Sequence, residues 1–402
     1  MEVNKARLID YWLGIPLCGV LSVFEKVTSL FLHKKKNISP RKIMFIGLSE
    51  MGSVILAYPA MRKTQELYPE AELFFLIFKE NEDVLHVLKT IPQKNVFTLK
   101  NTDVGTLCKN ILSLIFELRK KNIDTVIDIE LFSRFSSILS YLSGAKMRSG
   151  FHKYTMEGLF RGSLHTHKVI FNPYFHISIN FIALIESLRA DVGQMPLLKK
   201  ALKNYNVTLP ELLSDEREKE HIRQKLAKEN SCFCRQHAVV VINPDLKTRL
   251  PLRRWPSQNY TELAKKLLLS RNDIFIVIVG VGYEGVSFNF SHERCANMIG
   301  KTSLVELIGI FNVAAIVISH DSGILHLASL TSVGIIGFFG PETPVLYAPL
   351  NENKTIIFNE LSCSPCFSAF NHRTSICRDN KCINSISVEE VYALALKKLS
   401  DK

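Results

Sequence analysis

The chain has 402 residues, of which 47% are hydrophobic, and it carries a formal net charge of +12. This length is too great for one ordinary hydrophobic core and suits two domains. The positive charge favours an anionic partner, but the sequence has neither zinc-finger spacing nor an RNA-binding signature, so we expect no nucleic acid. A phosphorylated substrate, a phospholipid surface and a basic surface without a specific target remain as alternatives.

The first forty residues are apolar and aromatic and end in a lysine run at 34–36. Their longest stretch without charge, 11–24, has 14 residues, whereas a membrane-spanning helix needs about 20. No small-residue cleavage site precedes the basic end. We therefore expect residues 1–40 to form an in-plane or hairpin-like membrane anchor, with Tyr11 and Trp12 at the interface and the lysines on anionic headgroups. The alternative is a helix that docks on the protein itself.

Residues 41–210 alternate between short apolar runs and amphipathic stretches. Four of the runs predict strands: KIMFIGLS, AELFFLIF, NVFTL and IDTVIDIE. Helical patterns separate them, which predicts a parallel sheet flanked by helices. Residues 151–205 follow as a more irregular and helical part.

A highly charged stretch at 211–235 predicts a surface helix and a connector. Residues 236–402 then repeat the alternation, with AVVVINP, IFIVIVGVG, AIVISHD and VGIIGFFG as predicted strands. The fold class is therefore α/β, with two Rossmann-like domains, 41–210 and 236–402, expected to face each other across a cleft. Ligands of such sheets bind beyond the carboxyl ends of the strands.

The stretch SHDSGILHLASL lies at one of these strand ends. Asp321 or Ser322 suits the N-cap of the next helix, and Gly323 lets a ligand approach the backbone. The free amides of the first turn favour an anion, and His326 is expected on that turn as a further donor. A plain helix cap with a core histidine is the alternative.

Two further loops carry polar side chains after strands. The loop 243–256 holds Lys247, Arg249, Arg253 and Arg254, which suits a diphosphate because arginine pairs with it in bidentate fashion. A solvated charged loop is the alternative. In the turn GYEGVS, Glu284 could accept hydrogen bonds from ribose hydroxyls, although a single glycine-rich turn is weak evidence.

The first strand is followed by a turn that holds Glu50 and Ser53. A carboxylate here would face the cleft and could act as a base; an ordinary strand-to-helix connection is the alternative.

The chain has nine cysteines in an irregular pattern, which favours a reducing cytoplasm over a disulfide framework. Four of them gather near the C-terminus: Cys363, Cys366, Cys377 and Cys382. Their spacing allows either a zinc site or a cluster of reduced thiols.

Together these motifs resemble glycosyltransferase family 9, the heptosyltransferases that act on lipopolysaccharide core. The resemblance covers about residues 41–395 and is carried by LSEMGS, RRWP, the block from SLVELIG to FFGPETP, and CSPC. It implies the GT-B fold and an inverting transfer that needs no metal and no cofactor. It also implies diphosphate binding by Asp321, Ser322, Gly323 and His326, and a phosphate contact by Arg253.

One departure from the family matters for catalysis. Where the family has an aspartate as general base, this chain has Ser53, which is not basic near neutral pH. Either Glu50 takes over the role, with Glu130 as a third candidate, or the chain does not catalyse the usual reaction.

We therefore expect a cytoplasmic glycosyltransferase, attached peripherally to the inner face of the membrane. Its donor would be a nucleotide sugar such as ADP-heptose, and its acceptor an anionic lipid-linked glycan. Candidate acceptor contacts, which could equally be an exposed basic face, are Arg134, Arg148, His152 and Lys153. A catalytically silent nucleotide-sugar binder and a membrane-tethered adaptor remain as alternatives.

Overall fold

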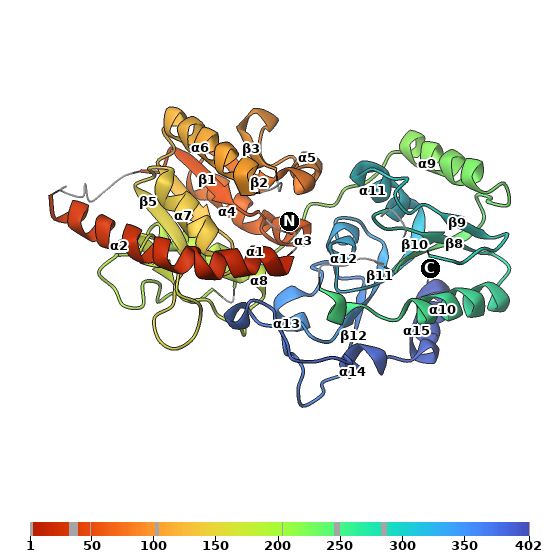
Figure 1. The fold of residues 1–402 in the computed structure, drawn as a ribbon. Coiled ribbons are helices and arrows are strands. Elements are labelled where there is room, and N and C mark those ends of the chain that lie inside the picture. Colours follow the sequence, from red (N-terminus) through yellow and green to blue (C-terminus); the bar gives the residue numbers. More distant parts are fainter. Residues whose placement is uncertain are drawn as a thin grey trace. The chain divides into compact units, whose positions relative to one another are not determined.

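The computed structural model describes residues 3–31, 39–48, 50–100, 104–202, 204–244, 250–282 and 288–401. The chain forms two compact units (Figure 1). Unit 1 consists of Met1–Val207 together with the short C-terminal segment Ser368–Arg373, and unit 2 consists of Thr208–Phe367 and Thr374–Lys402.

Unit 1 is built on a six-stranded parallel sheet in the order β3-β2-β1-β4-β5-β6. The strands are β1 (Lys42–Ile46), β2 (Glu72–Phe78), β3 (Val96–Leu99), β4 (Thr125–Asp128), β5 (Met147–Phe151) and β6 (His167–Val169). The strand order reverses direction between β1 and β4, where Ile46 pairs with Asp128. Open α/β sheets bind ligands at such a reversal.

Helices cover this sheet because its central strands are apolar on both faces. Residues Ile43 to Ile46 of β1 are completely buried, as expected for a parallel strand with helices on each side. The helices are α3 (Met51–Leu56), α4 (Tyr58–Leu67), α5 (Asp83–Leu88), α6 (Val104–Lys121), α7 (Arg134–Leu142) and α8 (Ile177–Ser187), with short 3₁₀ turns η1 (Lys79–Asn81) and η2 (Gln93–Asn95). Every residue of α8 is buried.

Two N-terminal helices, α1 (Val3–Trp12) and α2 (Gly14–Phe31), pack against each other and against α7. They dock through charged and small side chains. Asp10 accepts from the Arg134 guanidinium over 3.0 Å, and Glu25 pairs with Arg148 over 3.0 Å. A Cβ at Gly14 would lie 2.8 Å from the Arg134 Cβ, so only glycine allows this approach.

The opposite face of α1 and α2 is apolar and exposed, the reverse of an ordinary surface helix. Large apolar side chains exposed there include Trp12, Leu13, Leu17, Val20, Val23, Phe24, Val27, Leu30 and Phe31. Among the described residues, one helical stretch, Arg7–Phe31, is apolar and long enough to cross a membrane by length and composition. The segment thus docks on the protein itself, and it also leaves an apolar face uncovered.

Unit 2 repeats the architecture with the strand order β12-β11-β10-β7-β8-β9, again all parallel. Its strands are β7 (Ala238–Asn243), β8 (Ile274–Ile278), β9 (Cys295–Asn297), β10 (Ala314–His320), β11 (Gly334–Phe339) and β12 (Lys354–Phe358). The expected α/β class with two parallel-sheet units is confirmed. In unit 2 the order reverses between β7 and β10.

The helices of unit 2 include one within the stretch expected to be a connector. They are α9 (Glu216–Glu229), α10 (Ser257–Ser270), α11 (Leu304–Val313), α12 (Gly323–Ala328), α13 (Pro344–Tyr347), α14 (Lys381–Asn384) and α15 (Val388–Ser400), with the 3₁₀ turn η3 (Pro251–Arg253). A further turn, η4 (Ala369–Asn371), lies in the tail segment of unit 1. Helix α9 packs on α11 and β9 through Ile222 and Leu226, so it is part of unit 2.

The docking of α1 can be tested at its ion pair. We expect Asp10→Asn to lower the free energy of unfolding by about 3 kcal/mol, because it leaves the buried Arg134 charge without its carboxylate partner. Amide hydrogen exchange should then speed up in α1 and α2. As a control, Glu66→Gln at the exposed Lys63–Glu66 pair should change stability by less than about 0.5 kcal/mol. Unchanged exchange in both helices would contradict this account.

Candidate functional site

A polar cluster lies where the two central strands of unit 2 end. Asn243, the last residue of β7, is the register partner of Ser319 in β10. The Asn243 amide donates to the Ser319 hydroxyl over 3.0 Å and to the Ser322 hydroxyl over 3.2 Å. The two hydroxyls are 3.1 Å apart. Because the strands of an open α/β sheet present ligand sites at their carboxyl ends, this cluster marks the candidate site of unit 2.

The helix after this cluster differs from the expected one. Helix α12 has six residues, with Ser322 at the N-cap position but without a capping hydrogen bond from its side chain. So short a helix sums few peptide dipoles, and its attraction for an anion is correspondingly small. His326 is the fourth residue of this helix, where its first and last turns overlap, and it is 5% exposed.

Arg253 lies between two buried carboxylates of unit 2. Its Nε atom is 3.3 Å from Oδ2 of Asp321, and its Nη2 atom is 2.8 Å from Oε1 of Glu342. Trp255, two residues further on, is completely buried, and its indole donates to the carbonyl of Ile386 over 3.0 Å. The buried Trp255 side chain therefore holds the turn η3 in place, and the Arg253 guanidinium is fixed close to the end of β10.

Three residues of this site were not predicted from the sequence: Asn243, Ser319 and Glu342. The first two are polar residues at the end of a buried strand, and that position is the signal that could have identified them. Glu342 follows β11 by three residues, and nothing in the sequence indicates that it meets Arg253. The predicted residue Glu284 lies outside the described residues, as do Lys247 and Arg249.

In unit 1, Glu50 is the N-cap residue of α3, next to the reversal of strand order. Its side chain is 39% exposed, and its Oε1 atom lies 2.6 Å from Nη1 of Arg373. The Ser53 hydroxyl donates to Oε2 of Glu50 over a long distance of 3.4 Å. The structure thus brings the two predicted residues together and adds an arginine from the C-terminal segment.

Glu130 supports the backbone of the same region. Its Oε1 atom accepts from the amide of Leu48 over 2.6 Å and so holds the loop after β1. The neighbouring Asp128 is completely buried with Arg161 and His165. Burial raises the pKa of Asp128, but the Arg161 guanidinium and the hydrogen bond with His165 outweigh this effect and lower the pKa. Glu130 is thus engaged in holding the backbone, whereas the Glu50 side chain is 39% exposed.

These two strand-end sites occur in a chain that matches a known family. The family model described as glycosyltransferase family 9 (heptosyltransferase) matches residues 111–376, which is more than half of the chain. The chain belongs to glycosyltransferase family 9. It is therefore a glycosyltransferase, and the resemblance given by its sequence motifs is confirmed.

This family 9 protein is similar in sequence and in fold to known heptosyltransferases. The lipopolysaccharide core heptosyltransferase OpsX of Haemophilus influenzae is 24% identical over 79% of this chain and 84% of that protein. The structure of E. coli ADP-heptose lps heptosyltransferase II has a TM-score of 0.68, with 19% identity over 90% of this chain and 99% of that chain. E. coli heptosyltransferase WaaC with ADP has a TM-score of 0.58, with 15% identity over 89% of this chain and 99% of that chain. These similarities show the GT-B fold.

The expected acceptor contacts of this family 9 chain lie in different settings. Arg134 and Arg148 are 2% and 6% exposed and are paired with Asp10 and Glu25. An acceptor contact does not fit either arginine, because both guanidinium groups are used to dock α1 and α2. His152 and Lys153 directly follow β5 and are half-buried.

The C-terminal cysteines carry no geometric sign of a metal site. Within the described ranges, no group of three or more histidine, cysteine, aspartate or glutamate side chains is arranged to hold a metal ion. Burial raises the pKa of Cys382 to about 11, with nearby Cys366 adding to the shift. Its thiol is therefore protonated near neutral pH.

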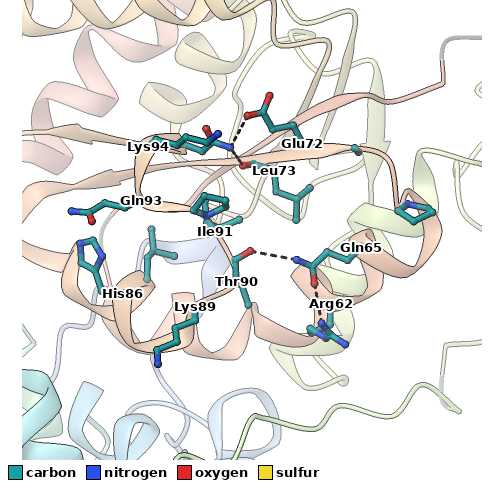
Figure 2. A pocket seen from close by; sticks show the side chains of 15 residues that line it. Arg62, Gln65, Glu72, Leu73, His86, Lys89, Thr90, Ile91, Gln93 and Lys94 are labelled. Atoms are coloured by element: carbon teal, nitrogen blue, oxygen red, sulfur yellow. Dashed lines mark hydrogen bonds between the residues drawn. The ribbon is translucent and has the colours of Figure 1, made fainter.

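A cavity of about 830 Å³ opens on unit 1 at the amino ends of β2 and β3 (Figure 2). Figure 2 shows Thr90 and Arg62 joined to Gln65 by hydrogen bonds along its wall. This is the edge of the sheet opposite to Glu50. Because ligands of open parallel sheets bind at the carboxyl ends, we do not assign the transfer chemistry to this cavity.

Two buried histidines of unit 1, His165 and His167, and the half-buried His152 predict that acid destabilises the fold. Burial lowers the pKa of His152, His165 and His167 to about 4, whereas an unfolded histidine has a pKa of about 6.5. The unfolded chain therefore binds more protons between these values, and stability falls as the pH drops from about 6.5 to 4. Each histidine contributes on the order of 1–2 kcal/mol by pH 5.

Urea denaturation followed by circular dichroism at several pH values measures this loss. We expect His167→Gln to flatten the pH dependence, and His221→Gln, at an exposed position of α9, to leave it unchanged. Equal slopes for the two variants would contradict the assignment.

Proposed function

We propose that this family 9 protein is an inverting, metal-independent heptosyltransferase that moves heptose from ADP-heptose to an anionic, lipid-linked acceptor of the lipopolysaccharide-core type. The observation that carries the proposal is the Arg253 guanidinium, held at the end of β10 beside the Asn243–Ser319–Ser322 cluster. The names of the related proteins support the choice of heptose, of ADP and of lipopolysaccharide.

In this proposal, unit 2 binds the donor. The leaving ADP gains negative charge as the sugar departs, and a cation fixed in advance stabilises that charge. Arg253 supplies this cation, and Ser322 and the Gly323 amide supply hydrogen-bond donors. Because α12 is short, we assign more of the stabilisation to Arg253 than to the helix dipole.

Three further residues complete the donor proposal. Asp321 orients Arg253 through the 3.3 Å ion pair. His326 and Glu284 are kept as the diphosphate contact and the ribose contact that the sequence suggests.

Unit 1 binds the acceptor in this proposal. Glu50 takes the proton of the acceptor hydroxyl, while that oxygen bonds to the anomeric carbon and the carbon–diphosphate bond breaks. The electron pair leaves with ADP, and attack on the opposite face inverts the anomeric carbon. Ser53 supports Glu50, and His152 and Lys153 are the proposed contacts to anionic groups of the acceptor.

Two variants separate the proposed roles. We expect Glu50→Gln to lower ADP release from ADP-heptose, with heptose-free lipopolysaccharide as acceptor, by about 100-fold or more. Its affinity for ADP, measured by isothermal titration, should stay within about 2-fold. We expect Arg253→Lys, which keeps the charge but loses the planar fork, to weaken ADP binding.

The remaining outcomes decide between the alternatives. ADP binding without turnover in the wild type would identify a silent nucleotide-sugar binder, an alternative that Ser53 keeps open. No ADP binding at all would favour a membrane-tethered adaptor. Full turnover in Glu50→Gln would remove Glu50 from the mechanism.

We also propose that α1 and α2 attach the protein peripherally to the cytoplasmic face of the membrane. Their charged and small side chains are turned to unit 1, and their exposed face is apolar. Lys26 is exposed on α2, and lysines 34–36 follow the helix in the sequence. An apolar face with adjacent lysines suits an anionic bilayer surface.

Vesicle flotation tests this attachment. We expect binding to vesicles that contain phosphatidylglycerol and a loss of at least about 10-fold in the variant Val20→Glu/Val27→Glu, because charge on the outer face opposes insertion. The matched control, Leu269→Glu/Val305→Glu, alters exposed apolar residues of unit 2 and should bind normally. Equal binding by both variants would contradict the proposal, and concentration-dependent self-association without vesicle binding would point to a second copy of the chain.

A further inference from the structure

A short piece of the C-terminal tail belongs to unit 1, although the residues on both sides of it belong to unit 2. This segment, Ser368–Arg373, is seated by an aromatic side chain. The ring of Phe370 lies 5.9 Å from that of Phe132 and 5.7 Å from that of Phe171. Both partner rings are almost completely buried, so the segment has a fixed seat in unit 1.

The next two residues are fixed as well. His372 and Arg373 have φ angles of 53° and 54°, a left-handed conformation that costs energy for residues other than glycine. The Nε2 atom of His372 lies 3.2 Å from Nη1 of Arg134. Burial lowers the pKa of His372, which favours the neutral ring that can accept from this guanidinium. The backbone amide of Arg373 donates to the carbonyl of Ser368 over 3.0 Å.

These contacts place one particular side chain beside Glu50. The Arg373 guanidinium is 2.6 Å from Oε1 of Glu50, while Ser53 approaches Oε2. The two carboxylate oxygens are thereby held from two sides. The arginine is 13% exposed and the glutamate 39%, so the pair still has an open side from which a hydroxyl group can approach.

We propose that Arg373 is a positioning residue for Glu50, delivered to unit 1 by the C-terminal tail. This inference rests on the proposed role of Glu50 as general base. A base acts only when it is within hydrogen-bond reach of the proton it removes, and small misplacements of reacting groups are costly. Arg373 and Ser53 together fix the orientation of the Glu50 carboxylate. This carboxylate lies one helical turn before the position of the family's usual base.

The first experiment compares Arg373→Gln with Arg378→Gln. Arg378 is exposed in the same tail, and its replacement removes the same charge. With ADP-heptose and heptose-free lipopolysaccharide, we expect Arg373→Gln to lower kcat about 10- to 100-fold with ADP affinity within about 2-fold. Arg378→Gln should retain wild-type kcat. Arg373→Lys retains a cation and should lose less activity than Arg373→Gln. It also provides a second test of the role of Arg373 if the glutamine variant does not fold.

A double-variant cycle distinguishes positioning from a merely structural role. If Arg373 acts through Glu50, adding Arg373→Gln to Glu50→Gln should lower kcat by no more than about 3-fold further. Losses that multiply would overturn the inference, as would wild-type kcat in Arg373→Gln when Glu50→Gln is inactive. Full activity of Glu50→Gln would instead remove the proposed base, and this inference would fall with it.

Discussion

A guanidinium taken out of water needs a carboxylate beside it, and this requirement organises both units. In unit 1, Arg134 and Arg148 meet carboxylates of the N-terminal helices, and Arg161 meets one at the end of β4. In unit 2, Arg253 is held by two. Because a broken pair leaves a buried charge, these arginines fix the segments that they join and with them the loops at the strand ends.

The sequence predicted the centre of each sheet better than its edges. The apolar runs identified β1 to β4, β7, β8, β10 and β11, all of which are confirmed. The unpredicted strands, β5, β6, β9 and β12, lie toward the sheet edges, and of the edge strands β3 alone was predicted. Edge strands are covered on fewer sides, so the sequences of β6, His-Lys-Val, and β9, Cys-Ala-Asn, need no apolar run. Strand β5 lies between β4 and β6, but an arginine interrupts its apolar pattern.

The candidate sites were predictable where one short stretch of chain forms them. Glu50 with Ser53, and the turn at Asp321, fall at strand ends that the alternation locates. Pairs formed by distant parts of the chain were not predictable. Arg134 and Asp10 are 124 positions apart, and Arg373 and Glu50 are 323 positions apart. Composition shows that arginines are abundant, but it does not indicate which carboxylate each one meets.

The membrane attachment proposed for the apolar face of α1 and α2 also bears on how a lipid-linked acceptor would be found. A protein held at a bilayer by its first helices searches for such a partner by lateral diffusion in two dimensions. Tethering both molecules to one surface raises their effective concentration without any new contact between them. With the attachment proposed above, unit 1 could bind its acceptor weakly and release the glycosylated product quickly, because the membrane would supply the encounter.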